Sequence, residues 1–427
     1  MSEHFAIDAE KQEKLKKIIL KLHGGAPVAE VKKDFGALIQ GVSAAEVAEM
    51  EQALIDNGMP VEEIQHLCEV HVEVFKASLD KEKISSKVEG HPAQTMLEEN
   101  KLARAKVRAL KKTVLAWRFA GGPQEKVLTA LDDLSKILIH YTRKENQLFP
   151  YLEKKEFTGP SRVMWGKHDE IRALFKDARA KVEQNDKSAI GSLHPLVGKI
   201  TKMIFMEEHI LIPEALRRLS DEDWARIRIG EDAIGFSWLR PGAMYDPHLV
   251  LAGAVRIATK PPIAGKSAMA PAPEAAPIVI ADSGAATETA AEALIELATG
   301  LVPRALLSSA LAAMPVDISI VDADDKVVYY SDSPHRIFPR SPAVIGRSVQ
   351  NCHPQKSVAT VNRILEAFRN KEKKDARFWL EMGGRFILID YVALYGADGE
   401  YAGTLEFSQD LTELRALQGQ HRLLDWE

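Results

Sequence analysis

Acidic and imidazole side chains occupy expected core positions in four amphipathic segments between residues 91 and 214. In each segment, apolar residues recur every three or four positions, which predicts a helix with one buried face. Each face carries one side chain able to bind a cation, and together these are Glu99, Glu145, His168 and Glu208. An ionised carboxylate in an apolar layer is costly unless it is paired or bound to a metal ion. The pattern therefore predicts a buried cation site.

The four side chains are expected at one level of a helical bundle. Glu99 and His168 lie near the starts of their predicted helices, whereas Glu145 and Glu208 lie near the ends of theirs. These ends coincide in an up-down-up-down bundle of four helices. No lysine or arginine is expected on the same faces, so a metal ion is expected to supply the positive charge. Carboxylate and imidazole ligands favour iron or manganese, and two ions are favoured over one.

His140 is a further candidate ligand, but it joins the site only if its helix is irregular. It precedes Glu145 by five residues, which sets the two side chains about 140° apart on a regular α-helix. A one-residue π-bulge turns both inward, and such bulges concentrate at functional sites. The position four residues after His140 is Lys144. Three more candidate metal ligands flank the apolar faces, namely His91, Glu207 and His209.

These segments resemble the hemerythrin-like HHE cation-binding bundle. The most specific pieces are HYTRKENQLFPYLEK (140–154), GPSRVMWGKHDEIR (159–172), MEEHILIPEAL (206–216) and NCHPQKSV (351–358). The chain as a whole resembles a bacterial and archaeal family with an N-terminal helical module, this bundle and a C-terminal PAS domain. The resemblance implies a non-haem di-iron centre, and it puts five residues on motif positions: His91, His140, Glu145, His168 and Glu208.

Two positions depart from the pattern of true hemerythrins. Arg172 stands in the third helix where a second histidine is usual. Met203 stands in the fourth helix where the HHE pattern often has histidine. Both departures argue against reversible O2 carriage, and the resemblance implies a sensing or stress-response role instead.

The composition is that of a globular protein without a membrane span or a basic surface. The 427 residues are 46% hydrophobic and 27% charged, with a net charge of −5, so neither nucleic acid nor an anionic membrane is an expected partner. No apolar run approaches the ~18 residues that span a bilayer. Two cysteines far apart in the sequence favour reduced thiols and a cytoplasmic location.

Residues 1–82 are predicted to form a separate helical module. Ser43 and Glu46 make a capping box at one helix start, and Gly58 ends that helix. Cys68 and His71 share a face of the next helix, where they could ligate a metal ion or guard the bundle site. The alternative, a buried cysteine beside a surface histidine, is favoured.

The rest of the chain is predicted to be multidomain. The bundle, with a C-terminal extension that holds a capping helix, is assigned to residues 83–257, and an Ala- and Pro-rich linker to residues 258–300. Helices are expected at 290–299 and 303–313. Residues 301–427 are predicted to form an α+β PAS domain, with two strands, a helix, three further strands and a C-terminal helix.

Cys352 and His353 come just before the long helix of the predicted PAS domain. Thiolate and imidazole bind haem iron, and a cysteine can be oxidised reversibly, so a haem or redox site is one interpretation. The slightly favoured alternative is a turn in which Pro354 starts the helix and His353 helps to cap it.

The sequence favours a cytoplasmic sensor or regulator whose non-haem iron site responds to O2, NO or redox state. The PAS domain would bind a second ligand or relay the signal. No Gly-rich phosphate loop, kinase core or helix-turn-helix is evident, so a protein partner or a homodimer through the PAS domain is expected to carry the output. The alternative is a di-iron enzyme or iron-delivery protein, acting in peroxide or NO reduction or in iron–sulfur cluster repair. A metal-free interaction protein is a third hypothesis.

Overall fold

The computed structural model describes residues 88–253, 294–334 and 336–419, together with isolated positions between Lys14 and Gln52. The chain divides into two compact units. The first is Met1–Lys260 with Arg340–Arg363, and the second is Pro261–Pro339 with Ile364–Glu427. Most of the predicted module 1–82, including Cys68 and His71, and most of the predicted linker 258–300 lie outside the described residues.

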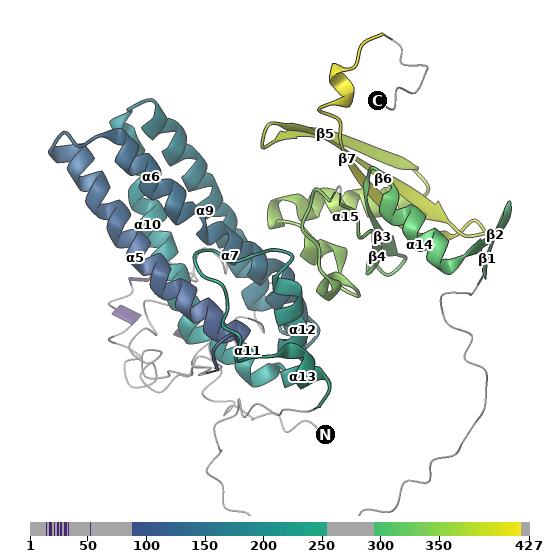
Figure 1. The fold of residues 1–427 in the computed structure, drawn as a ribbon, viewed down its shortest axis with the longest axis horizontal. Helices are drawn as coiled ribbons and strands as arrows, with labels where there is room; N and C mark the ends of the chain where they lie inside the picture. The colour runs from purple at the N-terminus through teal and green to yellow at the C-terminus, as the bar shows by residue number, and fades with distance from the viewer. Residues whose placement is uncertain are drawn as a thin grey trace, which may run out of the picture. The chain divides into compact units, whose positions relative to one another are not determined.

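Four helical rods form the bundle of the first unit and lie side by side (Figure 1). The first rod is α5 (Pro92–Phe119). The second rod consists of α6 (Gln124–Ser135), α7 (Ile137–Arg143), η1 (Lys144–Leu148) and α8 (Phe149–Glu153). The third rod is α9 (Gly159–Glu183). The fourth rod consists of η2 (Lys187–Ala189), α10 (Ile190–Met206), η3 (Glu207–Leu211) and α11 (Ile212–Arg218). This arrangement confirms the predicted four-helix bundle.

The rods bury the apolar faces that the sequence predicted. Met96, Leu134, Ile171 and Ile200, one from each rod, are fully buried in one continuous apolar core. Chain breakers lie at the boundaries between rods as expected. For example, Pro123 directly precedes α6, which begins at Gln124. The core therefore fixes which face of each rod points inward, and the polar side chains on those faces are carried inside with it.

The second and fourth rods each contain a π-helix, and each π-helix stands in the same relation to a proline. One residue separates η1 from Pro150, and one residue separates η3 from Pro213. In both, the amide of the residue after the π-helix donates to the carbonyl of its first residue, which is the i→i+5 bond. Proline lacks the N–H that would continue an α-helical ladder. The bulge that His140 required in order to turn inward is present in the second rod, and the one in the fourth rod was not anticipated.

The extension after the bundle contains α12 (Asp221–Glu231) and α13 (Pro247–Leu251). Ser220 and Asp223 form a capping box at the start of α12, which satisfies amides that have no partner in the first helical turn. The irregular residues between the two helices contact buried side chains of α5 and α7. The Ser237 amide donates to Glu99 of α5, and the Gly235 carbonyl accepts from Arg143 of α7. The predicted capping helix with an irregular packing segment is confirmed.

Residues 340–363 pack with the bundle in the first unit. They contain η4 (Pro342–Val344), η5 (Val349–Cys352) and the first part of α15 (Gln355–Arg369). Ala343 in η4 is 2% exposed and belongs to the same apolar core as the rods. The core of the first unit thus draws on stretches that are far apart in the sequence.

The second unit is built on a five-stranded antiparallel sheet in the order β4-β3-β7-β6-β5. Its strands are β3 (Asp317–Asp322), β4 (Val327–Tyr330), β5 (Asp375–Met382), β6 (Arg385–Tyr395) and β7 (Tyr401–Asp410). Ile387 and Ile389 of β6 pack with Ile337 in a small core of their own. Two strands, short helices, a longer helix and three strands follow one another as the sequence predicted for a PAS domain.

Two predictions at the edges of this unit are wrong. Residues 294–303 form a hairpin of β1 (Leu294–Leu297) and β2 (Gly300–Pro303), where a helix was expected over 290–299. Ile295 pairs with Val302 across this hairpin, so cross-strand pairing of apolar residues prevails over helix propensity. The helix expected next is present as α14 (Arg304–Ala313). The described part of the C-terminal tail, up to Gly419, has only the short 3-10 helix η6 (Leu414–Ala416) in place of the expected α-helix.

Candidate metal centre

Seven charged or imidazole side chains form one chain of contacts inside the bundle, and all are buried. We call this set the buried network: Glu99, His140, Arg143, Lys144, Glu145, His168 and Glu207. The four rods all contribute, since α5, α7 with η1, α9 and η3 each carry at least one member. Of the four side chains expected at one level, Glu99, Glu145 and His168 belong to this set, whereas Glu208 does not.

Glu99 anchors one end of the buried network. Its carboxylate accepts two hydrogen bonds from the Arg143 guanidinium, one from the backbone amide of Ser237 at 2.9 Å, and one from His140 Nδ1 at 2.6 Å. Burial alone would raise the pKa of Glu99, but the hydrogen bonds and charges of His140 and Arg143 outweigh it and lower the pKa to about 2. Glu99 is therefore an anion.

His140 lies between two carboxylates. Its Nδ1 is 2.6 Å from a Glu99 oxygen and its Nε2 is 3.0 Å from a Glu207 oxygen. Burial lowers the pKa of His140, but the charge of Glu207 and the hydrogen bonds to both carboxylates raise it above its usual value. Both ring nitrogens then carry protons and donate, so His140 is an imidazolium in this arrangement.

Lys144 stands at the centre of the buried network, with 1% of its surface exposed. Its ammonium forms an ion pair with Glu207 and lies 3.1 Å from His168 Nε2. Burial lowers the pKa of Lys144, and the nearby Glu207 carboxylate opposes that shift. The expectation that no lysine or arginine lies on the inward faces is wrong, because Lys144 and Arg143 are both buried there. The π-helix that turns Glu145 inward carries Lys144 inward with it.

His168 and Glu145 form the other end of the network. His168 Nδ1 donates to a Glu145 oxygen at 2.7 Å, and Arg172 donates to the second Glu145 oxygen at 2.7 Å. Burial lowers the pKa of His168 well below its usual value, and Lys144 and Arg172 add to that effect. The imidazole is therefore neutral with its proton on Nδ1, and the Nε2 lone pair faces the Lys144 ammonium.

The ring of Tyr141 stacks on His168, with ring centroids 4.1 Å apart and an interplanar angle of 10°. The Tyr141 hydroxyl is buried, and it has no hydrogen-bond partner within the described parts of the chain. Burial raises the pKa of this hydroxyl well above its usual value, so it remains a proton donor. Such a group is uncommon, because most buried polar side-chain atoms in folded proteins have a hydrogen-bond partner.

The extension supplies contacts that the sequence did not indicate. Arg143 lies 3.0 Å from the fully buried Glu231 of α12, and it also donates to the carbonyl of Gly235 at 3.0 Å. Burial raises the pKa of Glu231 to about 7. Glu231 ends a short helix with little apolar periodicity, so no pattern in the sequence marked it as an inward-facing carboxylate. The extension therefore completes the Arg143 end of the network.

Three of the candidate ligands have their contacts elsewhere. Glu208 forms a two-pronged ion pair with Arg104, at 2.6 Å for each bond, and its side chain is 19% exposed. His91 caps α5 by accepting from the amide of Ala93 at 3.2 Å, and burial lowers its pKa to about 4. His209 stacks on the ring of Phe205 and contacts the Phe205 carbonyl at 2.9 Å. The bonds of Glu208 to Arg104 and of His91 to Ala93 therefore tie these two side chains to residues other than the buried network.

The turn before α15 engages both of its candidate side chains. The Cys352 thiol donates to the carbonyl of Ser348 at 3.6 Å, and His353 Nδ1 donates to the carbonyl of Val349 at 2.8 Å. Both acceptors lie at or just before the start of η5, and Pro354 directly precedes α15. His353 thus bonds to the preceding η5, and both its capping of α15 and a haem or redox role for Cys352 and His353 stay predictions.

The donor chemistry of the buried network fits a metal ion, although a protein cation stands at its focus. Two imidazoles and three carboxylates are the ligand types that suit iron or manganese. Within the described residues, however, no three histidine, cysteine or acidic side chains are arranged to hold a metal ion directly. The Lys144 ammonium, a cation of the protein itself, occupies the point between His168 Nε2 and Glu207.

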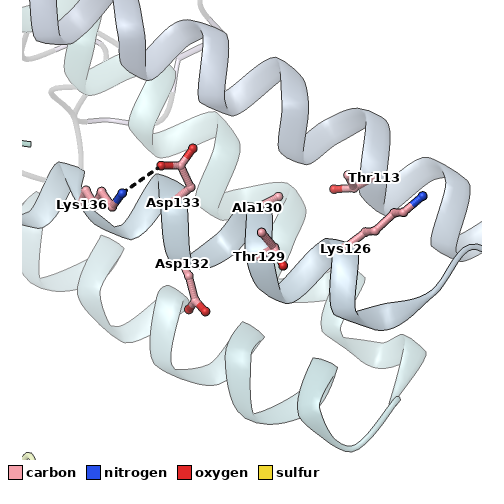
Figure 2. A pocket seen from close by; sticks show the side chains of 7 residues that line it. All are labelled: Thr113, Lys126, Thr129, Ala130, Asp132, Asp133 and Lys136. Atoms are coloured by element: carbon pink, nitrogen blue, oxygen red, sulfur yellow. Dashed lines mark ion pairs between the residues drawn. The ribbon is translucent and has the colours of Figure 1, made fainter. Parts of the chain in front are cut away.

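A surface hollow of about 610 Å³ lies along the bundle, and its lining includes no residue of the buried network. It is lined by Thr113, Lys126, Thr129, Ala130, Asp132, Asp133 and Lys136 (Figure 2). Asp133 is paired there with Lys106 at 2.7 Å and with Lys136 at 3.3 Å. The lining has no imidazole or thiol, so this hollow does not offer a transition-metal site.

Three family models match the chain in the order that the sequence predicted. Residues 15–81 match a family of unknown function (DUF438), residues 89–215 match the hemerythrin HHE cation-binding domain, and residues 307–412 match a PAS domain. Metal binding together with sensing is the function that this combination suggests. None of the helices that the structure describes is both long and apolar enough to cross a bilayer.

Solved structures similar to parts of the chain share little of its sequence. A C-terminal domain from Streptococcus mutans is 28% identical over 30% of this chain and 99% of its own, with a TM-score of 0.29. A sensory box sensor histidine kinase from Vibrio cholerae is 17% identical over 26% of this chain and 92% of its own, with a TM-score of 0.20. A PAS domain from Colwellia psychrerythraea is 16% identical over 26% of this chain and 97% of its own, with a TM-score of 0.21. Among curated proteins, none matches the chain.

Proposed function

We propose that the chain is a metal-responsive sensor or regulator, and that its buried network binds one divalent metal ion in place of the Lys144 ammonium. One observation carries the proposal. His168 Nε2 and a Glu207 oxygen, on different rods, both converge on a single buried cation. The HHE and PAS matches support a sensor that uses a cation, and the donor types favour iron, with manganese as the alternative.

Each member of the network has a role in this proposal. His168 and Glu207 are the ligands, because their lone pairs already face the cation position. Glu145 orients His168 through Nδ1, as a carboxylate commonly does for a metal-bound histidine. A bound iron ion would supply redox chemistry and an open position for O2 or NO. Tyr141, stacked on His168, is the donor available to such a small ligand.

The geometry favours one ion over the two that the sequence predicted. A second ion would need oxygen atoms of Glu99, but these accept from Arg143, His140 and the Ser237 amide. Removing those bonds would leave the fully buried Arg143 with fewer anionic neighbours. Breaking a buried ion pair costs about 3–5 kcal/mol, so the Glu99 side is the less accessible position.

Exchange of Lys144 for a metal ion gives the site two states. The ammonium and a divalent ion cannot share the same point, so metal binding requires Lys144 to leave the centre. Lys144 is the first residue of η1, and its departure changes the packing of that π-helix. A ligand that prefers one of two packed states shifts the balance between them, which is what a sensor needs. In this proposal a partner or a homodimer through the PAS domain then carries the signal.

The test is metal binding by the full chain, measured with Fe(II) without oxygen and with Co(II) as a spectroscopic probe. About one ion per chain is expected by elemental analysis, with the visible Co(II) bands of nitrogen and oxygen ligation. The Lys144→Met variant removes the competing cation, so its affinity is expected to rise about tenfold or more. Lys112→Met, which alters an exposed lysine of α5, is the matched control.

Two results would overturn the proposal. One is less than about a tenth of an ion per chain in both the natural protein and Lys144→Met. The other is an equal metal content after His168→Gln or Glu207→Gln, provided that circular dichroism shows both variants folded. Glu208→Gln is the control for Glu207→Gln, because Glu208 is the next residue and pairs with Arg104 outside the network.

A further inference from the structure

Two side chains from residues 340–363 donate hydrogen bonds to the backbone of η1. The Ser341 hydroxyl donates to the carbonyl of Asn146 at 2.8 Å, and Arg347 Nη1 donates to the carbonyl of Glu145 at 3.1 Å. Ser341 is 2% exposed and Arg347 is 5% exposed. Both bonds lie within the first compact unit, which contains residues 340–363.

Pro150 explains why these two carbonyls need donors from outside the helix. In an α-helix the carbonyl of Asn146 would accept from the amide of residue 150, and in a π-helix the carbonyl of Glu145 would accept from the same amide. Residue 150 is proline and has no N–H. Buried carbonyls without donors are costly, so the two bonds from Ser341 and Arg347 supply what the chain itself lacks.

The Arg347 side chain is fixed in place by contacts with two helices of the bundle. Its guanidinium makes two further bonds to the carboxylate of Glu153 in α8, at 2.7 and 2.8 Å, and it lies 5.4 Å from the ring centroid of Trp165 in α9. The two-pronged bond fixes the plane of the guanidinium. One side chain therefore ties α8 and α9 to the carbonyl of Glu145, a member of the buried network.

We infer that Ser341 and Arg347 are positioning residues for the buried network, because they stabilise the π-helical register of η1 that turns Lys144 and Glu145 inward. Residues 340–363 lie within the range matched by the PAS model, 307–412. A change in residues 340–363 is thus transmitted to the cation position through two backbone carbonyls. The metal part of this inference rests on the proposed function, whereas the effect on η1 does not.

Hydrogen exchange of the metal-free full chain tests the effect on η1. In Arg347→Met, amides of residues 145–152 are expected to exchange about tenfold faster, as when a buried carbonyl loses its donor, while amides of α5 keep their rates. Ser341→Ala is expected to give a smaller change at the same residues. Arg363→Met, an exposed arginine of the same segment, is the matched control.

Pro150→Ala provides the sharper version of this test. It restores an N–H that can donate to Asn146, so Ser341→Ala is expected to have little further effect in that background. Exchange that rises equally throughout the bundle in Arg347→Met would show general destabilisation and overturn the inference. If Arg347→Met does not fold, unchanged exchange at residues 145–152 in Ser341→Ala overturns it as well.

The metal readout separates this inference from the proposed function. Arg347→Met is expected to shift the Co(II) bands and to change the affinity by about tenfold, whereas Arg363→Met leaves both unchanged. Arg347→Lys keeps the positive charge but cannot form the bidentate bonds of a guanidinium. Its amide exchange rates at residues 145–152 are therefore expected to equal those of Arg347→Met. If no metal binds to any variant, the proposed function fails while the exchange result still decides the role of Ser341 and Arg347.

Discussion

The two π-helices share a sequence pattern and a backbone, yet their charged side chains have different surroundings. Aligned on their prolines, Lys144 corresponds to Glu207 and Glu145 to Glu208. The two first positions point toward one another and form an ion pair, and each is 1% exposed. In both helices, therefore, the first position is the one that the extra residue turns to the centre.

The second positions of η1 and η3, Glu145 and Glu208, differ in their exposure although their backbones are alike. Glu145 is 4% exposed and bonds to His168 and Arg172, whereas Glu208 is 19% exposed and bonds to Arg104. His168 lies on the inward face of α9 and draws Glu145 inside. Arg104 lies at the edge of α5, with its side chain 37% exposed, and keeps Glu208 near water. The π-helix therefore sets the direction of the side chain at its first position, whereas contacts with neighbouring helices set the environment of the side chain at its second position.

The largest expected effect comes from removing the charge at the first position of η3. Glu207→Gln leaves the buried Lys144 and His140 without one of their carboxylates, so the free energy of unfolding is expected to fall by about 3–5 kcal/mol. Urea unfolding of the full chain, followed by far-UV circular dichroism, measures it. A loss below about 1 kcal/mol would mean that the first positions do not form a buried ion pair.

Acid should weaken the buried ion pair at the first position of η3. Burial raises the pKa of Glu207, but the charges and hydrogen bonds of Lys144 and His140 outweigh it and hold the pKa well below the usual 4.5. A depressed pKa in the folded state gives stability that is present above pH 4.5 and is lost as the pH falls through the lower value. Each pKa unit of this depression corresponds to about 1.4 kcal/mol, so the free energy of unfolding should fall as the pH drops below 4.5.

One variant isolates the contribution of Glu207 to this acid sensitivity. Glu207→Gln should lose stability less steeply below pH 4.5 than the natural protein. Part of the slope remains in Glu207→Gln, because Glu99 also has a pKa lowered to about 2 and titrates in the same range. Identical slopes in the two proteins would contradict the assignment of Glu207 to a buried ion pair.

Replacing both partners of the central pair should restore most of the stability. Lys144→Met with Glu207→Met exchanges two buried charges for apolar side chains of similar length, and such exchanges are often neutral or stabilising. The double variant is expected within about 2 kcal/mol of the natural protein, although each single variant is much weaker. Additive losses in a double-mutant cycle of urea unfolding would show that the two first positions do not interact.

Much of the fold followed from apolar periodicity and chain breakers. The rods of the bundle and the order of elements in the sheet were predicted, because a buried face repeats every three or four residues in a helix and alternates in a strand. The hairpin at residues 294–303 was not predicted, since Ile295 and Val302 gain their stability from each other and not from local propensity.

The site was only partly predictable, and Lys144 shows why. The periodicity of a regular helix placed His140 and Glu145 on different faces, and the proposed bulge was argued only for those two. A bulge turns every residue that it contains, so it also brought Lys144 to the centre. Pro213, in the same relation to Glu207 as Pro150 to Lys144, was the signal that could have indicated the second π-helix. The contacts of Ser341 and Arg347 depend on tertiary packing and left no such signal.

The smallest expected effect is at the second position of η3, and it tests the comparison most directly. Glu208→Gln removes an ion pair whose arginine is 37% exposed, so its effect on the free energy of unfolding should stay below about 1 kcal/mol. Arg104→Gln should give a similarly small loss, and the double variant should show little coupling energy beyond that. The Co(II) spectrum and metal content should equal those of the natural protein. A loss of metal in Glu208→Gln alone would place the ligand at the second position of η3, as the apolar stripe in the sequence had suggested, and would assign the Lys144–Glu207 pair to stability.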